Sequence, residues 1–127
     1  MATAGARLEA VAPGEVVIAL PFHADLTQQH GFLHAGVVAA VVDSACGYAA
    51  LTLMEPGAAV LSVEFKINLM APAAGTSFRA VGRVVRSGRT LTVCGGELRA
   101  ASADGETTVA VMQATMMAVR ERAGLSD

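Results

Sequence analysis

The sequence predicts an α+β domain in which a curved antiparallel sheet wraps around one long central helix. A long apolar stretch, His34–Met54, contains a single charged residue, Asp43. The segment Leu61–Leu69 alternates between apolar and polar residues with a strict period of two, as a strand does. More β-like runs follow, separated by short turn signals. A helix that is hydrophobic on nearly all sides needs a sheet around it, so these observations favour one central helix within a sheet.

Composition predicts one folded domain over residues 1–127, with its core at about 13–119 and a polar tail at 120–127. The chain is 54% hydrophobic and only 16% charged, which excludes a disordered protein. Its net charge of −2 provides no basic surplus for nucleic acid. So small an apolar chain has more hydrophobic surface than one core can bury. We therefore expect self-association, as a homodimer or a dimer of dimers.

The first half of the chain predicts two short strands followed by the helix. Runs at Arg7–Ala12 and Glu15–Leu20 are β-like and are joined by the turn dipeptide Pro13-Gly14. Residues 23–30 are polar and predict an irregular segment or a single helical turn. The helix then starts at about His34, and Glu55-Pro56-Gly57 ends it.

The second half predicts four antiparallel strands joined by short turns. In the first, Leu61–Leu69, the alternation turns Ser62 away from the face that Leu61 and Val63 share. The other three strands and the two turns between them follow in order: Thr76–Arg86, Ser87-Gly88, Thr90–Ala101, Asp104-Gly105 and Glu106–Val119.

The remaining signals favour a cytoplasmic protein that holds no metal and spans no membrane. Cys46 and Cys94 match no metal or redox spacing, so we expect reduced thiols. Gly31 interrupts any helix between His30 and His34, which argues against a metal-binding pair. The N-terminus lacks the pattern of a signal peptide. Asp43, at the middle of the one long apolar stretch, argues against a membrane span.

Asp43 is a carboxylate in a helix that should be buried. An ionised carboxylate in an apolar interior costs several kcal/mol unless it is paired or hydrogen-bonded. Small residues surround it at helical spacing and leave room for a ligand to approach: Gly36, Ala39, Ala40, Gly47 and Ala50. The residues alone leave two interpretations open, a functional carboxylate or a structural one that hydrogen-bonds a neighbour.

The start of the helix is a second candidate. Gly31 and then small residues, Ala35 and Gly36, lie at the helix N-terminus. Free backbone N–H groups at such a terminus can stabilise a developing oxyanion. By itself this signal is weak, because many helices begin with small residues.

These residues form a motif that resembles the hotdog-fold acyl-CoA thioesterases of the phenylacetate-pathway and 4-hydroxybenzoyl-CoA thioesterase type. The motif runs from Gln28 through Gly31 and His34-Ala35-Gly36 to Asp43-Ser44-Ala45. Residues 63–72 look like the strand after the helix in that family, and residues 84–90 are similar to its Gly-Arg turn. The resemblance extends from about Pro13 to Val119. It implies a cytoplasmic homo-oligomer with the hotdog fold that hydrolyses acyl or aryl-acyl CoA without a cofactor.

The resemblance also implies a role for each of five residues. Asp43 matches the catalytic carboxylate, which acts as nucleophile or as general base on water. Ala35 replaces the usual glycine whose N–H polarises the thioester carbonyl, and Gln28 matches the amide that places the thioester or the water. His34 matches the histidine that shapes the entrance and hydrogen-bonds near the carbonyl. Ser62 stands where some members use Ser or Thr to orient the water or the carboxylate.

Helix geometry predicts that the site is shared between two chains. Ala35 and Asp43 are eight residues apart, so they lie about 12 Å apart along one helix axis. A nucleophile and an oxyanion donor must each come within about 3 Å of the same carbonyl. We therefore expect Ala35 and Gln28 from one subunit to meet Asp43 from the other, as in the family's dimers.

The turn Arg86-Ser87-Gly88-Arg89 is the candidate contact for the CoA phosphates. Two guanidinium groups beside free N–H groups suit a phosphate. A solvated hairpin turn explains the same residues, so both interpretations stay open.

Two other functions are weighed against thioester hydrolysis. A hydratase on the same fold needs a His–Asp acid–base pair, and the sequence offers His34 alone for it. A non-catalytic acyl-CoA-binding hotdog module is the second alternative, and Ala35 in place of glycine keeps it open.

Overall fold

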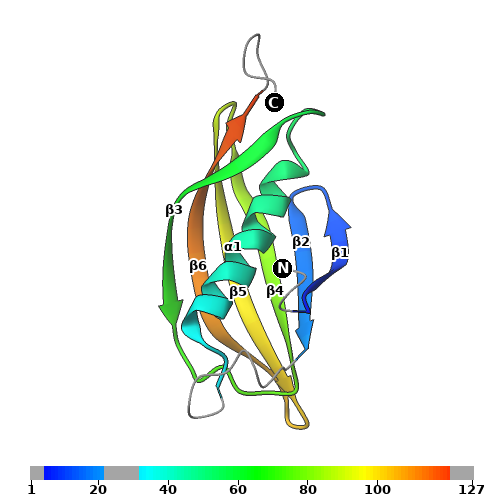
Figure 1. The fold of residues 1–127 in the computed structure, drawn as a ribbon, viewed down its shortest axis with the longest axis vertical. Coiled ribbons are helices and arrows are strands. Elements are labelled where there is room, and N and C mark those ends of the chain that lie inside the picture. The colour runs from blue at the N-terminus through cyan, green and yellow to red at the C-terminus, as the bar shows by residue number, and fades with distance from the viewer. Residues whose placement is uncertain (1–4, 22–31, 121–127) are drawn as a thin grey trace.

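The computed structural model describes residues 5–21 and 32–120, which form one helix against one curved sheet (Figure 1). Within these residues the elements are β1 (Arg7–Ala12), β2 (Glu15–Pro21), α1 (Ala35–Leu51), β3 (Ala59–Leu69), β4 (Ser77–Ser87), β5 (Leu91–Ser102) and β6 (Gly105–Val119). The predicted arrangement of a curved antiparallel sheet around one central helix is confirmed. The observed strands start and end within two residues of the predicted positions.

The sheet order is β1-β2-β4-β5-β6-β3, and every neighbouring pair is antiparallel. Strand β3 thus lies beside β6 and not beside β4, its neighbour in the chain. Figure 1 shows β3 and β1 at the two edges of the sheet, with α1 across its concave face. The connection after β3 therefore crosses the end of the sheet, which places the strand that follows the helix at an open edge.

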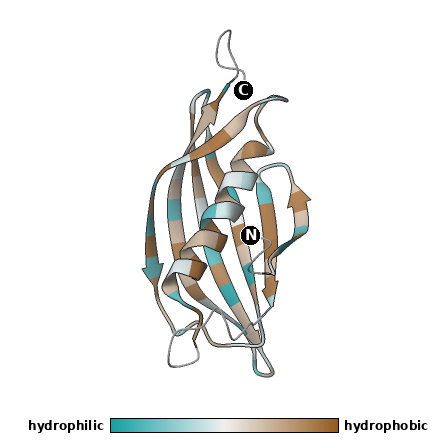
Figure 2. Cartoon of the chain, viewed as in Figure 1, coloured by the Kyte–Doolittle hydropathy of each residue, from teal (hydrophilic) through white to brown (hydrophobic). Residues whose placement is uncertain are grey.

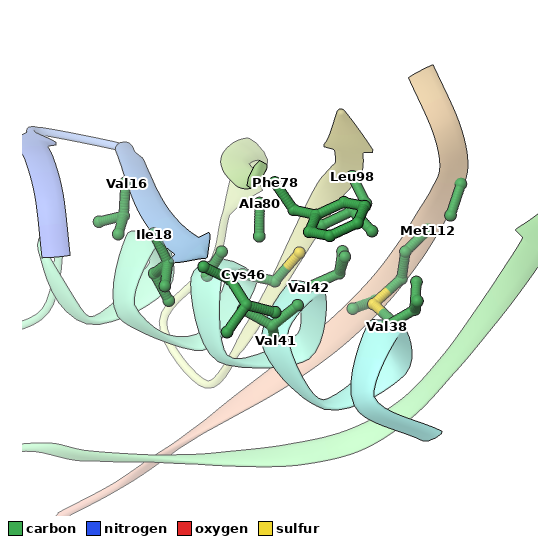
Figure 3. Packing of buried hydrophobic residues seen from close by; sticks show 14 of the residues in the cluster. Val16, Ile18, Val38, Val41, Val42, Cys46, Phe78, Ala80, Leu98 and Met112 are labelled. Atoms are coloured by element: carbon green, nitrogen blue, oxygen red, sulfur yellow. The ribbon is translucent and has the colours of Figure 1, made fainter. Parts of the chain in front are cut away.

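The helix is three residues shorter at its C-terminal end than predicted. It ends at Leu51, and the Thr52 N–H still donates to the carbonyl oxygens of Tyr48 and Ala50. One face of α1 packs on the sheet, where Val41, Val42 and Cys46 are fully buried (Figure 3). In this single chain the opposite face of α1 is exposed, and Tyr48 on that face is 46% exposed. The expectation of burial on nearly all sides therefore holds for only part of the helix.

Two glycines in the sheet let the middle of α1 approach it closely. A Cβ atom at Gly82 in β4 would lie 2.3 Å from the carbonyl oxygen of Ala45. A Cβ atom at Gly96 in β5 would lie 2.7 Å from Val42 Cγ1 and 2.8 Å from Cys46 Sγ. Because backbone and buried side chains occupy this space, a larger residue would push out the segment that contains Asp43.

A β-bulge in β3 corrects the predicted facing of Ser62. Ser62 lies opposite Met116 and Glu64 lies opposite Thr115, so Val63 has no partner of its own on β6. The extra residue shifts the alternation by one position. Ser62 shares the helix-facing side with the fully buried Met116. The strict alternation predicted for Leu61–Leu69 is therefore wrong at Val63.

Edge strand β3 remains largely hydrophobic although it is exposed. In Figure 2, brown hydrophobic bands along this strand are separated by teal hydrophilic ones. Leu61 and Val63 are each 53% exposed, Phe65 is 46% exposed and Leu69 is 55% exposed. A long apolar edge with unpaired backbone groups is a template for pairing with another strand.

The close approach predicts that Gly82→Ala destabilises the fold. The added methyl group meets the Ala45 carbonyl, and we expect the free energy of unfolding to fall by about 2–3 kcal/mol in urea denaturation. Gly95→Ala is the matched control, because its Cβ would lie an ordinary 3.7 Å from Val85 Cγ2. We expect that control to change stability by less than about 0.5 kcal/mol. Equal stability of the two variants would contradict the packing account.

Candidate active site

Asp43 and Ser62 form the polar centre of the candidate site. Asp43 is half-buried in the middle of α1, and Ser62 lies on β3 next to it. The Ser62 hydroxyl donates a hydrogen bond of 2.8 Å to Asp43 Oδ1. Its oxygen also lies 3.4 Å from Met116 Sδ. The bulge therefore brings a hydroxyl donor to the one carboxylate within α1.

At the start of α1, one backbone amide has no acceptor among the residues that the structure describes. His34 is the N-cap, and its Nδ1 accepts the N–H of Gly36 at 2.8 Å. The N–H groups of Val37 and Val38 donate to the His34 carbonyl oxygen at 2.9 Å and 3.1 Å. Among the contacts of residues 5–21 and 32–120, the Ala35 N–H is the one first-turn amide without an acceptor.

One chain does not bring Ala35 and Asp43 to the same point. Both lie on the straight helix Ala35–Leu51, separated by about 12 Å of helical rise. Gln28, the third residue predicted to join this site, lies outside the described residues. The structure thus brings Asp43 and Ser62 together and leaves the amide of Ala35 at the far end of the helix.

The predicted phosphate turn lies at the opposite end of the molecule from the helix N-terminus. Arg86 and Ser87 end β4, Gly88 and Arg89 form the turn after it, and all four are exposed. Arg89 lines an open hollow of about 510 Å³ together with Arg120 and residues 55–58. Arg86 is not part of its lining.

Arg120 is the residue at this hollow that sequence reasoning missed, because it was assigned to the polar tail at 120–127. Its guanidinium donates to the Glu55 carboxylate and to the carbonyl oxygen of Arg89. These contacts join the end of β6, the turn after α1 and the turn after β4. An arginine directly after a long strand is a signal only when the strand order is known.

Both cysteines are buried between the helix and the sheet, Cys46 on α1 and Cys94 on β5. Burial raises the pKa of the Cys46 thiol to about 12, and Cys94 and Asp43 nearby add to the rise. Burial also raises the pKa of the Cys94 thiol to about 11. Both are reduced, and the Cys94 thiol donates to the Cys46 carbonyl oxygen at 3.4 Å. Neither can supply a thiolate nucleophile near neutral pH.

The described parts of the chain contain neither a metal-binding cluster nor a membrane-crossing helix. Residues 5–21 and 32–120 contain no cluster of three or more His, Cys, Asp or Glu side chains of the kind that binds a metal. In the same residues, no helix combines the length and the apolar character that crossing a membrane requires.

Comparison with known proteins identifies the family to which this chain belongs. Residues 30–106, which include the helix, β3, β4 and β5, match the family model of the Thioesterase superfamily. The chain belongs to this superfamily. Its resemblance to hotdog-fold thioesterases is thereby confirmed, together with the fold that the resemblance implies.

Individual relatives agree with this superfamily assignment. A thioesterase family protein from Silicibacter pomeroyi is 52% identical with a TM-score of 0.94, over 95% of this chain and 89% of that one. Human acyl-coenzyme A thioesterase 13 is 34% identical over 66% of this chain and 60% of its own length. The Escherichia coli PaaI protein, from the phenylacetic acid degradation operon, is 21% identical with a TM-score of 0.81, over 93% of this chain and 82% of its own, and shares the fold. The chain spans 60% to 64% of the length of its first curated relatives.

The raised pKa values of the two thiols predict that the folded protein does not react with Ellman's reagent. At pH 8 both thiols are neutral and shielded from solvent, so we expect no thiol to react within minutes. In urea, both cysteines of the chain should react. Rapid reaction of the native protein would contradict the burial. The result also decides whether a thiol-release assay needs correction.

Proposed function

We propose that this chain hydrolyses an acyl-CoA or aryl-acyl-CoA thioester to the free acid and CoA. The observation that carries the proposal is the hydrogen bond from Ser62 to Asp43, which holds a half-buried carboxylate beside an exposed apolar strand. The superfamily and the human relative named acyl-coenzyme A thioesterase support thioester hydrolysis and a CoA substrate.

In the proposed reaction the Ser62 hydroxyl stays hydrogen-bonded to Asp43 Oδ1, and Asp43 Oδ2 is the oxygen that reacts. As a general base, Oδ2 takes a proton from water while the water oxygen attacks the thioester carbon. As a nucleophile, Oδ2 attacks that carbon itself, and water then hydrolyses the anhydride. In both routes the C–S bond breaks and CoA leaves as a thiolate that is later protonated. A thiolate leaves readily, so the site needs no strong general acid.

The oxyanion donor in this proposal is the Ala35 N–H of a second copy of the chain. The 12 Å between Ala35 and Asp43 on one helix excludes a shared carbonyl within one chain. Edge strand β3 holds Ser62 and has free backbone groups along its outer side. Pairing of two copies along β3 is the contact that would bring one helix start toward the other chain's carboxylate.

The distribution of charge favours β3 over the outer face of the sheet as this contact. On that outer face Glu97 accepts hydrogen bonds from Arg83 at 3.2 Å, Arg99 at 2.8 Å and Thr108 at 3.2 Å. These donors hold the pKa of Glu97 below its usual range, although burial opposes the shift. The outer face therefore has a polar network at its centre. On β3 the exposed apolar side chains Leu61, Val63, Phe65 and Leu69 outnumber its two charged residues, Glu64 and Lys66.

The CoA phosphates are proposed to bind at the hollow beside Arg89. Arg120 supplies a second guanidinium there, partly satisfied by Glu55. A fork of N–H donors and an open hollow suit a phosphate group. Arg86, Ser87 and Gly88 stay candidate contacts from the same turn.

Asp43→Asn tests the proposed function. Loss of the carboxylate should lower kcat by at least a hundredfold, about 3 kcal/mol of barrier, for whichever acyl-CoA is turned over. Thiol release would be measured with short-chain, medium-chain and aryl acyl-CoAs. Asp104→Asn is the matched control, because Asp104 is exposed in the turn between β5 and β6. We expect it to behave as wild type.

Two results would contradict the proposal. Full activity of Asp43→Asn would remove the carboxylate from the chemistry. Absence of turnover on every thioester, in a protein that is folded and binds CoA, would favour the non-catalytic acyl-CoA-binding module.

A further inference from the structure

The cap of α1 is an unusual one. Ser, Thr, Asp and Asn are the common N-cap residues, and their side-chain oxygens accept an amide of the first turn. Here the acceptor is an imidazole nitrogen: Gly36 N–H donates to His34 Nδ1 at 2.8 Å. The His34 backbone has the extended conformation of a cap, with φ −62° and ψ 137°.

This hydrogen bond indicates which ring nitrogen of His34 is the acceptor. A nitrogen that accepts a hydrogen bond cannot hold a proton, so Nδ1 is bare and the ring proton of the neutral imidazole is on Nε2. The same residue therefore accepts three amide N–H groups at the start of the helix. Its Nδ1 takes the Gly36 amide and its carbonyl takes those of Val37 and Val38.

Gly36 is the residue that makes room for the imidazole. A Cβ atom at this position would lie 3.0 Å from His34 Nδ1 and 3.3 Å from His34 Cε1. Contacts this short force the imidazole to move, and movement lengthens the bond to the Gly36 amide. His34 and Gly36 therefore form one unit, which we name the imidazole cap.

We propose that the imidazole cap positions the oxyanion donor: His34 accepts the N–H groups of Gly36, Val37 and Val38, and among the described residues this leaves the Ala35 N–H as the first-turn donor without an acceptor, fixed in direction. This inference rests on the proposed role of Ala35 in thioester hydrolysis. It makes His34 a positioning residue that acts through the helix backbone, rather than a group that hydrogen-bonds the substrate carbonyl.

The charge of the cap explains why an imidazole suits this place. An Asp cap would accept the same amide, but it would put a negative charge next to the oxygen that becomes negative in the reaction. A neutral imidazole accepts the hydrogen bond without that charge. Asn is neutral too, and its Oδ1 is attached at the same distance along the side chain as Nδ1.

Four variants test the imidazole cap by their kcat for thioester hydrolysis. His34→Ala removes the acceptor, and we expect kcat to fall about tenfold. His34→Asn restores a neutral acceptor and should recover most of the wild-type kcat. His34→Asp should fold as well as His34→Asn yet stay about tenfold slower. Gly36→Ala displaces the imidazole and should also lose about tenfold.

Gly36→Ala separates positioning from stability, since alanine is the better helix former. We expect its melting temperature to equal or exceed that of wild type while its kcat falls. Thr52→Val is the matched control at the other end of α1, because it removes the 2.7 Å bond from Gly14 N–H to Thr52 Oγ1. It should lower the melting temperature and leave kcat unchanged.

The imidazole cap is contradicted if His34→Asn is as slow as His34→Ala, or if Gly36→Ala keeps the wild-type kcat. A loss of kcat in Thr52→Val equal to that in His34→Ala would also overturn it, as a general effect of helix stability. Nitrogen NMR of His34 tests the cap without turnover. The Nε2–H tautomer is expected in wild type, and its absence would overturn the imidazole cap. The proposed function would still stand in that case, provided that Asp43→Asn loses its activity as expected.

Discussion

The hydrogen bond between Ser62 and Asp43 ties the open edge of the sheet to the middle of the helix, and the proposed site depends on it. It exists because Val63 bulges out of β3 and turns Ser62 toward α1. Gly82 and Gly96 let the helix lie close enough to the sheet for this contact to form. A carboxylate in such a position needs a donor, since an unpaired half-buried charge is costly. The bulge and the two glycines would thus serve the proposed chemistry as well as the packing.

The same helix carries both halves of the proposed reaction at separate places. Its middle holds the carboxylate and its start holds a free amide, and the rigidity of an α-helix prevents them from meeting within one chain. In the proposed dimer a second chain would resolve this separation, because β3 is an apolar edge next to the carboxylate. Catalysis would then require self-association, which the high hydrophobic content of the sequence also favours.

Much of this architecture can be predicted from the sequence, because it depends on local periodicity. The apolar stretch that becomes α1 and the alternating strands are confirmed to within a few residues. The position of β3 beside β6 could not be predicted, since strand order is a long-range property. The bulge at Val63 was missed because alternation has no signal for an extra residue, so Ser62 was assigned the wrong face. Arg120 was missed because its partners come from two distant turns. The motif placed Asp43, Ala35 and His34 on one helix, but only coordinates show that the His34 imidazole faces the backbone.

The central claim is that Asp43 of one chain and the Ala35 amide of another act on one thioester. Ala35→Pro removes that N–H at the first helical position, where proline is well tolerated, and the extended ψ of 137° at His34 accommodates a following proline. The measurement is thiol release from a refolded equimolar mixture of Asp43→Asn and Ala35→Pro chains, each inactive alone. Half of the dimers would then pair unlike chains, and each of those would have one intact site. The account predicts recovery of about a quarter of the wild-type activity. No recovery in verified mixed dimers would contradict it.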